Sequence, residues 1–286
     1  MKKELITYRD PKSPLSEVFR TLRTNIQFTN MNKKSNVILI TSAAPGEGKS
    51  WVASNLAVTF AQASKRVLLI DGDMRKGRLF NVFETSPRPG LSNFLAEEAE
   101  YADFSRIQRY MQNTGIENLY MISAGTVPPN PSELLVKKQM ETLLEKIREV
   151  FDIVIIDGTP CSLVTDSIIL SRIVDSTIVV ASYGETKRED LNNTVKALRN
   201  VGAHLAGIVM NKMPKSKKKY NQSYYYGSTL TVSKKKGRKE GVRKYTFNRV
   251  SADEFATPRD SENEEMEDTN TDNIINQVND YLKDDE

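Results

Sequence analysis

The sequence contains only one cysteine, Cys161, and one histidine, His204, among its 286 residues. A single cysteine excludes an internal disulfide, and together with the lack of a signal-peptide pattern it favours the cytoplasm. A single histidine removes metal sites built from several histidines and acid–base chemistry that relies on histidine. Because His204 stands in an apolar run, we expect it to be structural.

Long apolar runs and several enzyme motifs are also missing. No run approaches the ~20 apolar residues that span a bilayer, so any link to a membrane must come through a partner or a surface contact. No His-Arg-Asp or Asp-Phe-Gly triplet occurs, which excludes the eukaryotic protein-kinase fold. Asn211 is followed by Lys and Met without the aspartate of the guanine-reading motif, so the sequence favours ATP over GTP.

Charge is distributed unevenly along the chain. The formal net charge is +4, but residues 212–249 hold 13 basic side chains and one acid, whereas residues 250–286 hold 13 acids and two bases. Such blocks repel internally and bury little, so we expect a disordered carboxyl-terminal tail, basic over 214–249 and acidic over 250–286. A weak apolar repeat predicts one short helix at 273–283. Because the blocks attract each other, we expect no nucleic-acid partner. A tail that binds nucleic acid or a membrane surface is the alternative.

Between residues 36 and 211, short apolar runs alternate with helical patterns. The runs are continuous and rich in β-branched residues, as in parallel strands covered on both faces. We predict strands at Val37–Ser42, Arg66–Asp71, Leu119–Ser123, Asp152–Asp157, Ser176–Ser182 and Leu205–Asn211. We predict helices at about 15–28 (with an apolar stripe of Leu15, Phe19, Leu22 and Ile26), Ser50–Ser64, Pro131–Val150 with Ser132 as N-cap, Asp166–Ile173 and Arg188–Val201. This pattern predicts one α/β domain over residues 1–213, a doubly wound, mostly parallel sheet with ligands at the carboxyl ends of its strands.

The stretch ITSAAPGEGKS, Ile40–Ser50, has the pattern of a phosphate-binding loop between a strand and a helix. Gly46 and Gly48 let the backbone turn its N–H groups toward phosphate oxygens. Lys49 reaches the β- and γ-phosphates, and the Ser50 hydroxyl is placed to bind Mg²⁺. We therefore predict a P-loop NTPase that uses ATP and Mg²⁺. The residues expected to contact ATP are Ala44, Pro45, Gly46, Glu47, Gly48, Lys49, Ser50, Trp51 and Asn211.

Carboxylates end two of the predicted strands. Asp157 ends DIVIID, the usual place of an acid that holds Mg²⁺ through water. Asp71 and Asp73 end RVLLIDGD, and side chains two residues apart at a strand end point roughly the same way. Alone, such a pair would be interpreted as a solvated turn; beside a phosphate loop, a catalytic or metal-binding role is favoured.

Taken together, these motifs resemble the bacterial tyrosine kinases of capsule and exopolysaccharide biosynthesis. AAPGEGKS, VLLIDGDMR and IVIIDGTP look like the family's Walker A, A′ and B motifs, and SAGTVPPNPSELL (Ser123–Leu135) matches another typical stretch. The resemblance covers about residues 13–213. It implies an ATP-dependent protein-tyrosine kinase that phosphorylates itself in trans and regulates polysaccharide synthesis and export.

The resemblance implies a role for each matching residue. Lys49 and Ser50 would hold phosphate and Mg²⁺, and Asp73 and Asp157 would support the metal. Asp71 would be the base that takes the proton from an incoming tyrosine. Physical chemistry alone does not choose between Asp71 and Asp73, because a phenol of pKa ~10 needs only a nearby carboxylate and an in-line γ-phosphate.

EVFRTLR, Glu17–Arg23, matches the oligomerisation motif of the same family. Glu17 and Arg20 could equally form a solvated pair within a helix. Arg20 and Arg23 lie close together on such a helix, however, and two like charges favour an outside anion. In the family that anion belongs to a neighbouring subunit of a ring. We therefore expect Glu17, Arg20 and Arg23 to contribute to a homo-oligomer.

A tyrosine cluster, KKKYNQSYYYG at Lys217–Gly227, follows the predicted domain. It occupies the place of the family's carboxyl-terminal substrate tyrosines, so we expect phosphorylation of Tyr220, Tyr224, Tyr225 and Tyr226. Each phosphate would add nearly two negative charges, enough to neutralise the neighbouring lysines and to loosen a ring that inserted tails help to hold.

The resemblance also implies partners. The chain looks like the split, Gram-positive form, in which a membrane protein of the polysaccharide-export machinery activates the kinase and recruits it to the membrane. A cognate phosphotyrosine phosphatase is implied likewise. The alternative is a partition-type ATPase that positions cargo on membrane or DNA through its basic tail. Ala44, where those ATPases carry a signature lysine, and the tyrosine cluster favour the kinase, and intact Lys49, Asp71, Asp73 and Asp157 disfavour an inactive scaffold.

Overall fold

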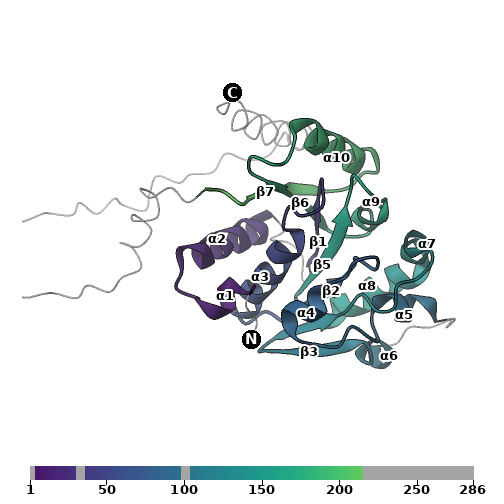
Figure 1. Ribbon diagram of the computed structural model, residues 1–286. Helices are drawn as coiled ribbons and strands as arrows, with labels where there is room; N and C mark the ends of the chain where they lie inside the picture. Colours follow the sequence, from purple (N-terminus) through teal and green to yellow (C-terminus); the bar gives the residue numbers. More distant parts are fainter. Residues whose placement is uncertain (1–3, 30–35, 98–103, 215–286) are drawn as a thin grey trace, which may run out of the picture.

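A computed structural model of the chain describes residues 4–29, 36–97 and 104–214. Within them, seven strands form one sheet in the order β3-β4-β2-β5-β1-β6-β7, with helices on both faces (Figure 1). All neighbouring strands are parallel except β3 and β4. The strands are β1 (Asn36–Ser42), β2 (Val67–Asp71), β3 (Met111–Ile116), β4 (Leu119–Ile122), β5 (Ile153–Pro160), β6 (Ser176–Ser182) and β7 (Leu205–Asn211). The predicted doubly wound, mostly parallel sheet is confirmed.

The helices divide between the two faces of the sheet. They are α1 (Ile6–Arg9), α2 (Pro14–Thr29), α3 (Lys49–Ala61), α4 (Leu79–Phe83), α5 (Leu91–Ala96), α6 (Phe104–Gln108), α7 (Pro131–Val136), α8 (Lys138–Val150), α9 (Asp166–Ser171) and α10 (Arg188–Asn200). Alternate residues of β1 enter opposite cores: Ile38 and Ile40 pack with α2 and α3, and Val37 and Leu39 pack with α8 and α9. Strands buried on both faces are therefore apolar throughout, which is why their sequence shows no alternation.

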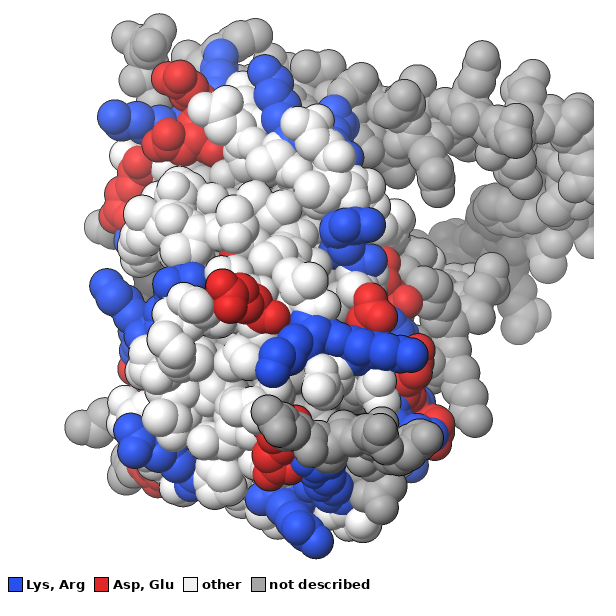
Figure 2. Space-filling model, turned by 90° about the vertical axis from the view of Figure 1, so that its right-hand side faces the viewer, with Lys and Arg blue, Asp and Glu red and all other residues white. Residues whose placement is uncertain are grey.

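Charge is sparse over one side of this domain. Figure 2 views the molecule from the right-hand side of Figure 1, where α7 lies, and uncharged side chains cover most of that face. No helix in the described part of the chain is long and apolar enough to cross a membrane.

The domain boundary at residue 213 stays a prediction. The basic segment 214–249, apart from Pro214, and the acidic segment 250–286 lie outside the described residues.

Local structure differs from the predictions in four places. The predicted helix Pro131–Val150 is two helices, because Lys137 adopts an extended conformation that separates α7 from α8. Asn130, and not Ser132, precedes the first of them. The edge strand β3 was missed because its sequence, MQNTGI, is polar and half-exposed. Along α2, Phe19 and Ile26 are buried as the stripe predicted, but Leu15 is 41% exposed.

Asn55 of α3 joins the amino-terminal segment to the rest of the domain. Its side-chain oxygen accepts hydrogen bonds from both the amide and the hydroxyl of Thr7, each at 3.1 Å. Its side-chain amide donates to the carbonyl of Glu4 at 3.2 Å and to that of Trp51 at 2.9 Å. Asn55 is fully buried, so these groups have no water to replace the contacts.

We expect Asn55→Ala to lower the free energy of unfolding by about 1–3 kcal/mol, because it leaves buried partners unsatisfied. Urea unfolding followed by circular dichroism measures this. Asn193→Ala, at an exposed position of α10, is the matched control and should change the unfolding free energy by less than about 0.5 kcal/mol. Equal effects of the two substitutions would contradict the anchoring role.

Candidate active site

The carboxyl ends of β1, β2 and β5 bring the predicted site together. In the sheet, Asp157 of β5 lies level with Asp71 of β2 on one side and with Ile40 of β1 on the other. Two residues after Ile40, β1 ends at Ser42 and the phosphate loop begins. Parallel strands thus place one carboxylate beside the other and both beneath the loop, as the motif order predicts.

The loop has the backbone shape that phosphate binding requires. Gly46 and Gly48 have φ values of +83° and +94°, a region that favours glycine. Gly48 directly precedes α3 and offers no side-chain cap, which leaves the first N–H groups of the helix available to an anion. A Cβ on Gly48 would lie 2.1 Å from Nδ2 of Asn211, which itself donates to the carbonyl of Glu47 at 2.9 Å. Asn211 therefore packs against the loop.

Ala44 and Glu47 stabilise the phosphate loop without lining the cavity. The Glu47 carboxylate is buried and accepts a hydrogen bond from the Ala44 amide at 2.9 Å and another from the hydroxyl of Thr186. Neither Ala44 nor Glu47 lines the adjoining cavity, whereas Pro45, Gly46, Gly48, Lys49, Ser50 and Trp51 do. Thr186, in the turn between β6 and α10, was not predicted because 139 residues separate it from Glu47.

Lys49 is the centre of the charged groups. Its ammonium lies 3.2 Å from the hydroxyl of Ser50 and 3.4 Å from a carboxylate oxygen of both Asp73 and Asp157. Burial opposes the positive charge, but the carboxylates of Asp157 and Asp73 outweigh it, so the pKa of Lys49 is raised. Lys49 is therefore cationic at neutral pH, as phosphate binding requires.

Asp71 and Asp73 differ more than their spacing predicts. Asp71 is fully buried; one of its oxygens accepts the Leu79 amide at 3.0 Å, and the other accepts the Asp73 amide at 3.3 Å. Asp73 is 8% exposed and faces the cavity, where it accepts the Lys76 amide at 2.9 Å. The reason is that the strand ends at Asp71, so the alternation of side chains no longer applies to Asp73. Asp71 holds the loop, and Asp73 lines the site.

Burial and crowding weaken the acidity of the two innermost carboxyls. Burial and the neighbouring charge of Asp157 raise the pKa of Asp71 to about 7. Burial also raises the pKa of Asp157, although Lys49 and a hydrogen bond from Ser50 oppose the shift. Displaced pKa values in a cavity are a mark of functional sites.

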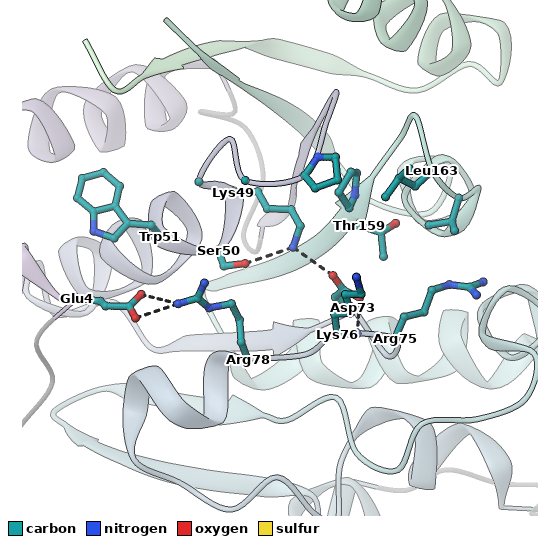
Figure 3. Close-up of a pocket in the computed structure, with 15 residues that line it drawn as sticks. Glu4, Lys49, Ser50, Trp51, Asp73, Arg75, Lys76, Arg78, Thr159 and Leu163 are labelled. Carbon is teal, nitrogen blue, oxygen red and sulfur yellow. Dashed lines mark hydrogen bonds and ion pairs between the residues drawn. The ribbon is translucent and has the colours of Figure 1, made fainter. Parts of the chain in front are cut away.

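A cavity of about 290 Å³ opens over these groups (Figure 3). Several residues that line it were not among the predicted site residues: Glu4, Arg75, Lys76, Arg78, Thr159, Pro160, Leu163 and Val164. Arg75, Lys76 and Arg78 come two to five residues after Asp73, and this closeness in sequence was the available signal. Glu4 reaches the site from the amino-terminal segment, and the sequence has no motif for that contact.

Arg75 fixes the loop after β2 to helix α9. Its guanidinium pairs with Asp166 through two hydrogen bonds of 2.9 and 3.2 Å. Asp166 is fully buried at the start of α9, so removal of Arg75 would leave a buried charge without its partner. The hydrogen bond and the charge of Asp166 raise the pKa of Arg75.

The oxygen atoms present fit a magnesium ion. Within the described residues no group of three or more His, Cys, Asp or Glu side chains is arranged to enclose a metal. Mg²⁺, however, is ordinarily held by one or two carboxylates together with substrate phosphates and water. Ser50, Asp73 and Asp157 supply such oxygens, and the buried Oδ2 of Asp157 has no hydrogen-bond partner. That unsatisfied atom is the observation in favour of a cation here.

The three residues of the predicted oligomerisation motif lie apart from this cavity on α2. Glu17 and Arg20 form an ion pair within the helix, and Arg20 also contacts the carbonyl of Pro11. Arg23 instead points toward α3 and donates to the carbonyl of Thr59 at 2.9 Å. The predicted phosphorylation sites Tyr220, Tyr224, Tyr225 and Tyr226 lie outside the described residues.

Comparison with known proteins places this site among nucleotide-binding enzymes. The family model described as "AAA domain" matches residues 35–207. Tyrosine-protein kinase YwqD of Bacillus subtilis is 37% identical over 228 residues, 80% of this chain and 93% of that protein. Tyrosine-protein kinase CpsD of Streptococcus pneumoniae is 35% identical over 74% of this chain and 90% of that protein. The crystal structure of the chimerical protein CapA2B2 superposes with a TM-score of 0.68 at 35% identity, covering 74% of this chain and 91% of that one.

The raised pKa of Asp71 predicts a pH-dependent stability. Since the unfolded pKa is ~3.9, the folded protein binds more protons between pH ~4 and ~7, and stability is lost as the pH rises through that range. A shift of this size corresponds to at most about 4 kcal/mol. In Asp71→Asn, which cannot ionise, the decline between pH 5 and 8 should be shallower. Urea unfolding in EDTA at several pH values measures it.

The control for this experiment is Asp152→Asn. Burial tends to raise the pKa of Asp152, but hydrogen bonds from Arg66 outweigh that effect and leave it lowered, so its contribution is lost only below pH ~4. For Asp152→Asn, the free energy of unfolding should change with pH between 5 and 8 as steeply as it does for the unsubstituted protein. Parallel slopes for Asp71→Asn and the unsubstituted protein would disprove the assignment.

Proposed function

Since this chain belongs to the bacterial tyrosine kinases of capsule and exopolysaccharide biosynthesis, we propose that it transfers the γ-phosphate of ATP to tyrosines in the carboxyl-terminal segment of a neighbouring copy. The chain is a tyrosine-protein kinase and uses ATP. The proposal adds the substrate, the transfer in trans and the regulation of polysaccharide synthesis and export. The convergence of Lys49 with Ser50, Asp73 and Asp157 is the observation that carries it.

The reaction follows from the groups around the cavity. The loop N–H groups and Lys49 bind the β- and γ-phosphates and offset the charge that develops during transfer. The tyrosine oxygen forms a bond to the γ-phosphorus, the bond from that phosphorus to the bridging oxygen breaks, and ADP leaves. The phenol proton passes to a carboxylate, for which Asp71 and Asp73 are the candidates.

Mg²⁺, which Ser50, Asp73 and Asp157 would hold, supplies positive charge to the phosphates when bound. Asp73 faces the cavity and meets an incoming hydroxyl, whereas Asp71 has the pKa better matched to taking a proton near neutral pH. Both features support participation of the pair, with Asp71 as the base that the family resemblance implies. A water in place of the phenol would give slow ATP hydrolysis.

The tail tyrosines have the chemistry of a substrate. Tyr220, Tyr224, Tyr225 and Tyr226 stand in a polar, lysine-rich segment that begins within ten residues of β7. A segment of this composition buries little apolar surface of its own and can enter a site on another molecule. Phosphorylation would reverse much of its local charge.

The wider arrangement is a homo-oligomeric ring, in which Glu17, Arg20 and Arg23 of α2 contribute to the interface. We further propose a cytoplasmic chain that a membrane-bound activator recruits, and a phosphatase that resets the tyrosines. The similar solved protein CapA2B2 is chimerical, which supports a second component as the activator. The alternative is a partition-type ATPase that acts through the basic tail.

The test is phosphate mapping by mass spectrometry after incubation with Mg·ATP and the activator segment. We expect phosphate on Tyr224, Tyr225 and Tyr226, and at least a hundredfold less with Lys49→Met, on the scale of about 10²–10³ for a lost charge-stabilising donor. Lys65→Met, at an exposed lysine outside the cavity, is the control and should retain activity. Hydrolysis stimulated by DNA or lipid without phosphotyrosine would support the partition-type ATPase instead.

The ring predicts a specific effect of charge on α2. Arg20→Glu would place a carboxylate beside Glu17 and dissociate the assembly, which light scattering after size-exclusion chromatography detects. Lys196→Glu, an equal charge reversal on the exposed face of α10, should leave the assembly intact. If both variants keep the mass of the unsubstituted protein, the Glu17–Arg20 pair is only a contact within the helix.

A further inference from the structure

Four cationic side chains line the active-site cavity, and they differ in what holds them: Lys49, Arg75, Lys76 and Arg78. Lys49 is committed to Asp73 and Asp157 and to nucleotide phosphate. Arg75 is committed to Asp166, because that carboxylate is fully buried and would lose its partner. Lys76 and Arg78 do not pair with a buried carboxylate among the residues that the structure describes.

Arg78 is held by a partner that it can leave. One of its nitrogens donates to both oxygens of Glu4, at 2.9 and 3.0 Å. The side chains are 57% and 47% exposed, so water can replace either partner, and such pairs contribute little to stability. Lys76 bonds to Asp73 only through its backbone amide, and its ammonium makes no hydrogen bond or ion pair with any residue that the structure describes. Two cations at the cavity are thus available to an anion.

The surroundings of Arg78 suit an aromatic phosphate. Figure 3 shows Arg78 and Glu4 on the Trp51 side of Lys49, whereas Arg75 lies on the Leu163 side. Trp51 is partly exposed in the cavity and is held from behind by an edge contact with Phe19, at 5.2 Å between ring centroids. An indole and a guanidinium on the same side of the cavity offer an apolar contact for a phenyl ring and a planar, charged donor for its phosphate.

The proposed substrate supplies such a group after its first modification. Before phosphorylation, the segment around Tyr224, Tyr225 and Tyr226 carries lysines and no acid, so it has nothing for Arg78 to bind. After one transfer, the next acceptor has a phosphotyrosine as its immediate neighbour. Adjacent residues are ~3.8 Å apart along the chain, so an acceptor that enters the cavity brings its neighbour to the cavity's edge.

We propose that Arg78, assisted by Lys76, binds the phosphate of a phosphotyrosine adjacent to the tyrosine being phosphorylated, so that the first transfer promotes the next. This inference rests on the proposed function of the site and names its preferred substrate class, a tyrosine peptide that already carries phosphate. Glu4 occupies Arg78 until that phosphate arrives. The consecutive tyrosines of the tail are then phosphorylated at increasing rates.

Synthetic peptides of residues 217–230 test the preference directly. Tyr224 is the single acceptor, with Phe at 220 and 226, and position 225 carries phosphotyrosine, Phe or Glu. A second set places the acceptor at 225 and the variable residue at 224. In the better set we expect kcat/KM for the phosphotyrosine peptide to exceed that for the Phe peptide about tenfold, mainly through KM, as for one charge-assisted contact. The Glu peptide, with one charge, should lie between them.

Three variants of the full chain assign the preference to Arg78. In Arg78→Ala the ratio of kcat/KM between the phosphotyrosine and Phe peptides should fall to about one. In Arg66→Ala, which removes an arginine of equal exposure paired with Asp152 away from the cavity, the tenfold ratio should remain. In Glu4→Gln, which frees Arg78, the ratio should rise. If the Arg78–Glu4 pair only held the amino-terminal segment in place, Glu4→Gln and Arg78→Ala would change the kcat/KM ratio in the same direction.

The outcomes separate this inference from the proposed function. Equal kcat/KM for all peptides, with the acceptor tyrosine phosphorylated in each, would overturn the inference and leave the tail as substrate. Equal loss on the phosphotyrosine and Phe peptides in Arg78→Ala would show that Arg78 serves the nucleotide, and would overturn it too. Absence of phosphate on any tail peptide and on the tail itself would instead overturn the proposed function.

Discussion

The positive charge of Lys49 allows three acidic side chains to lie close together at the carboxyl edge of this sheet. Asp157 and Asp71 lie level on adjacent strands, and Asp73 follows two residues later, so three acids share a small volume. Without a cation, carboxylates at this distance raise one another's pKa and part of the charge is lost to protonation. The ammonium lies 3.4 Å from two of them and remains charged because they outweigh its burial. Phosphate and metal would enter a site that this balance already prepares.

The loop after β2 depends on the same balance, because its anchor is Asp71. That carboxylate receives the amides of Asp73 and Leu79 and so fixes both ends of the turn. A Cβ on Gly77 would lie 2.9 Å from Asp71 and 2.4 Å from Ala124, so the turn packs closely on the acid beneath it. From this turn Arg75 pairs with Asp166 of α9, and Arg78 pairs with Glu4. One buried acid thereby positions residues that it does not touch.

The parts of this site that the sequence predicts are those built by local patterns. Buried strands appear as continuous apolar runs, and the glycines of the phosphate loop mark its turn, so the sequence could predict that Lys49, Ser50 and Asp157 lie together at one edge of the sheet. The different burial of Asp71 and Asp73 could not be, since the strand rule ends where the strand does. Contacts such as that of Glu4 with Arg78, 74 residues apart, depend on tertiary packing that no short pattern encodes. The five-residue helix α4 is likewise too short to form without that packing.

The depth of the acids also constrains what the site can phosphorylate. Asp73 lines the cavity at 8% exposure and Asp71 lies fully buried beside it, so a hydroxyl must descend into the cavity to approach the pair. A serine or threonine hydroxyl lies one bond beyond Cβ, and its backbone would have to follow it in. A phenol places its oxygen at the far end of a rigid ring, which leaves the backbone outside. A tyrosine held on a folded surface would bring its neighbours into collision with the loop, whereas one on an extended, polar segment would not. In the proposed reaction, the recessed acids would therefore complement the lysine-rich segment that bears consecutive tyrosines.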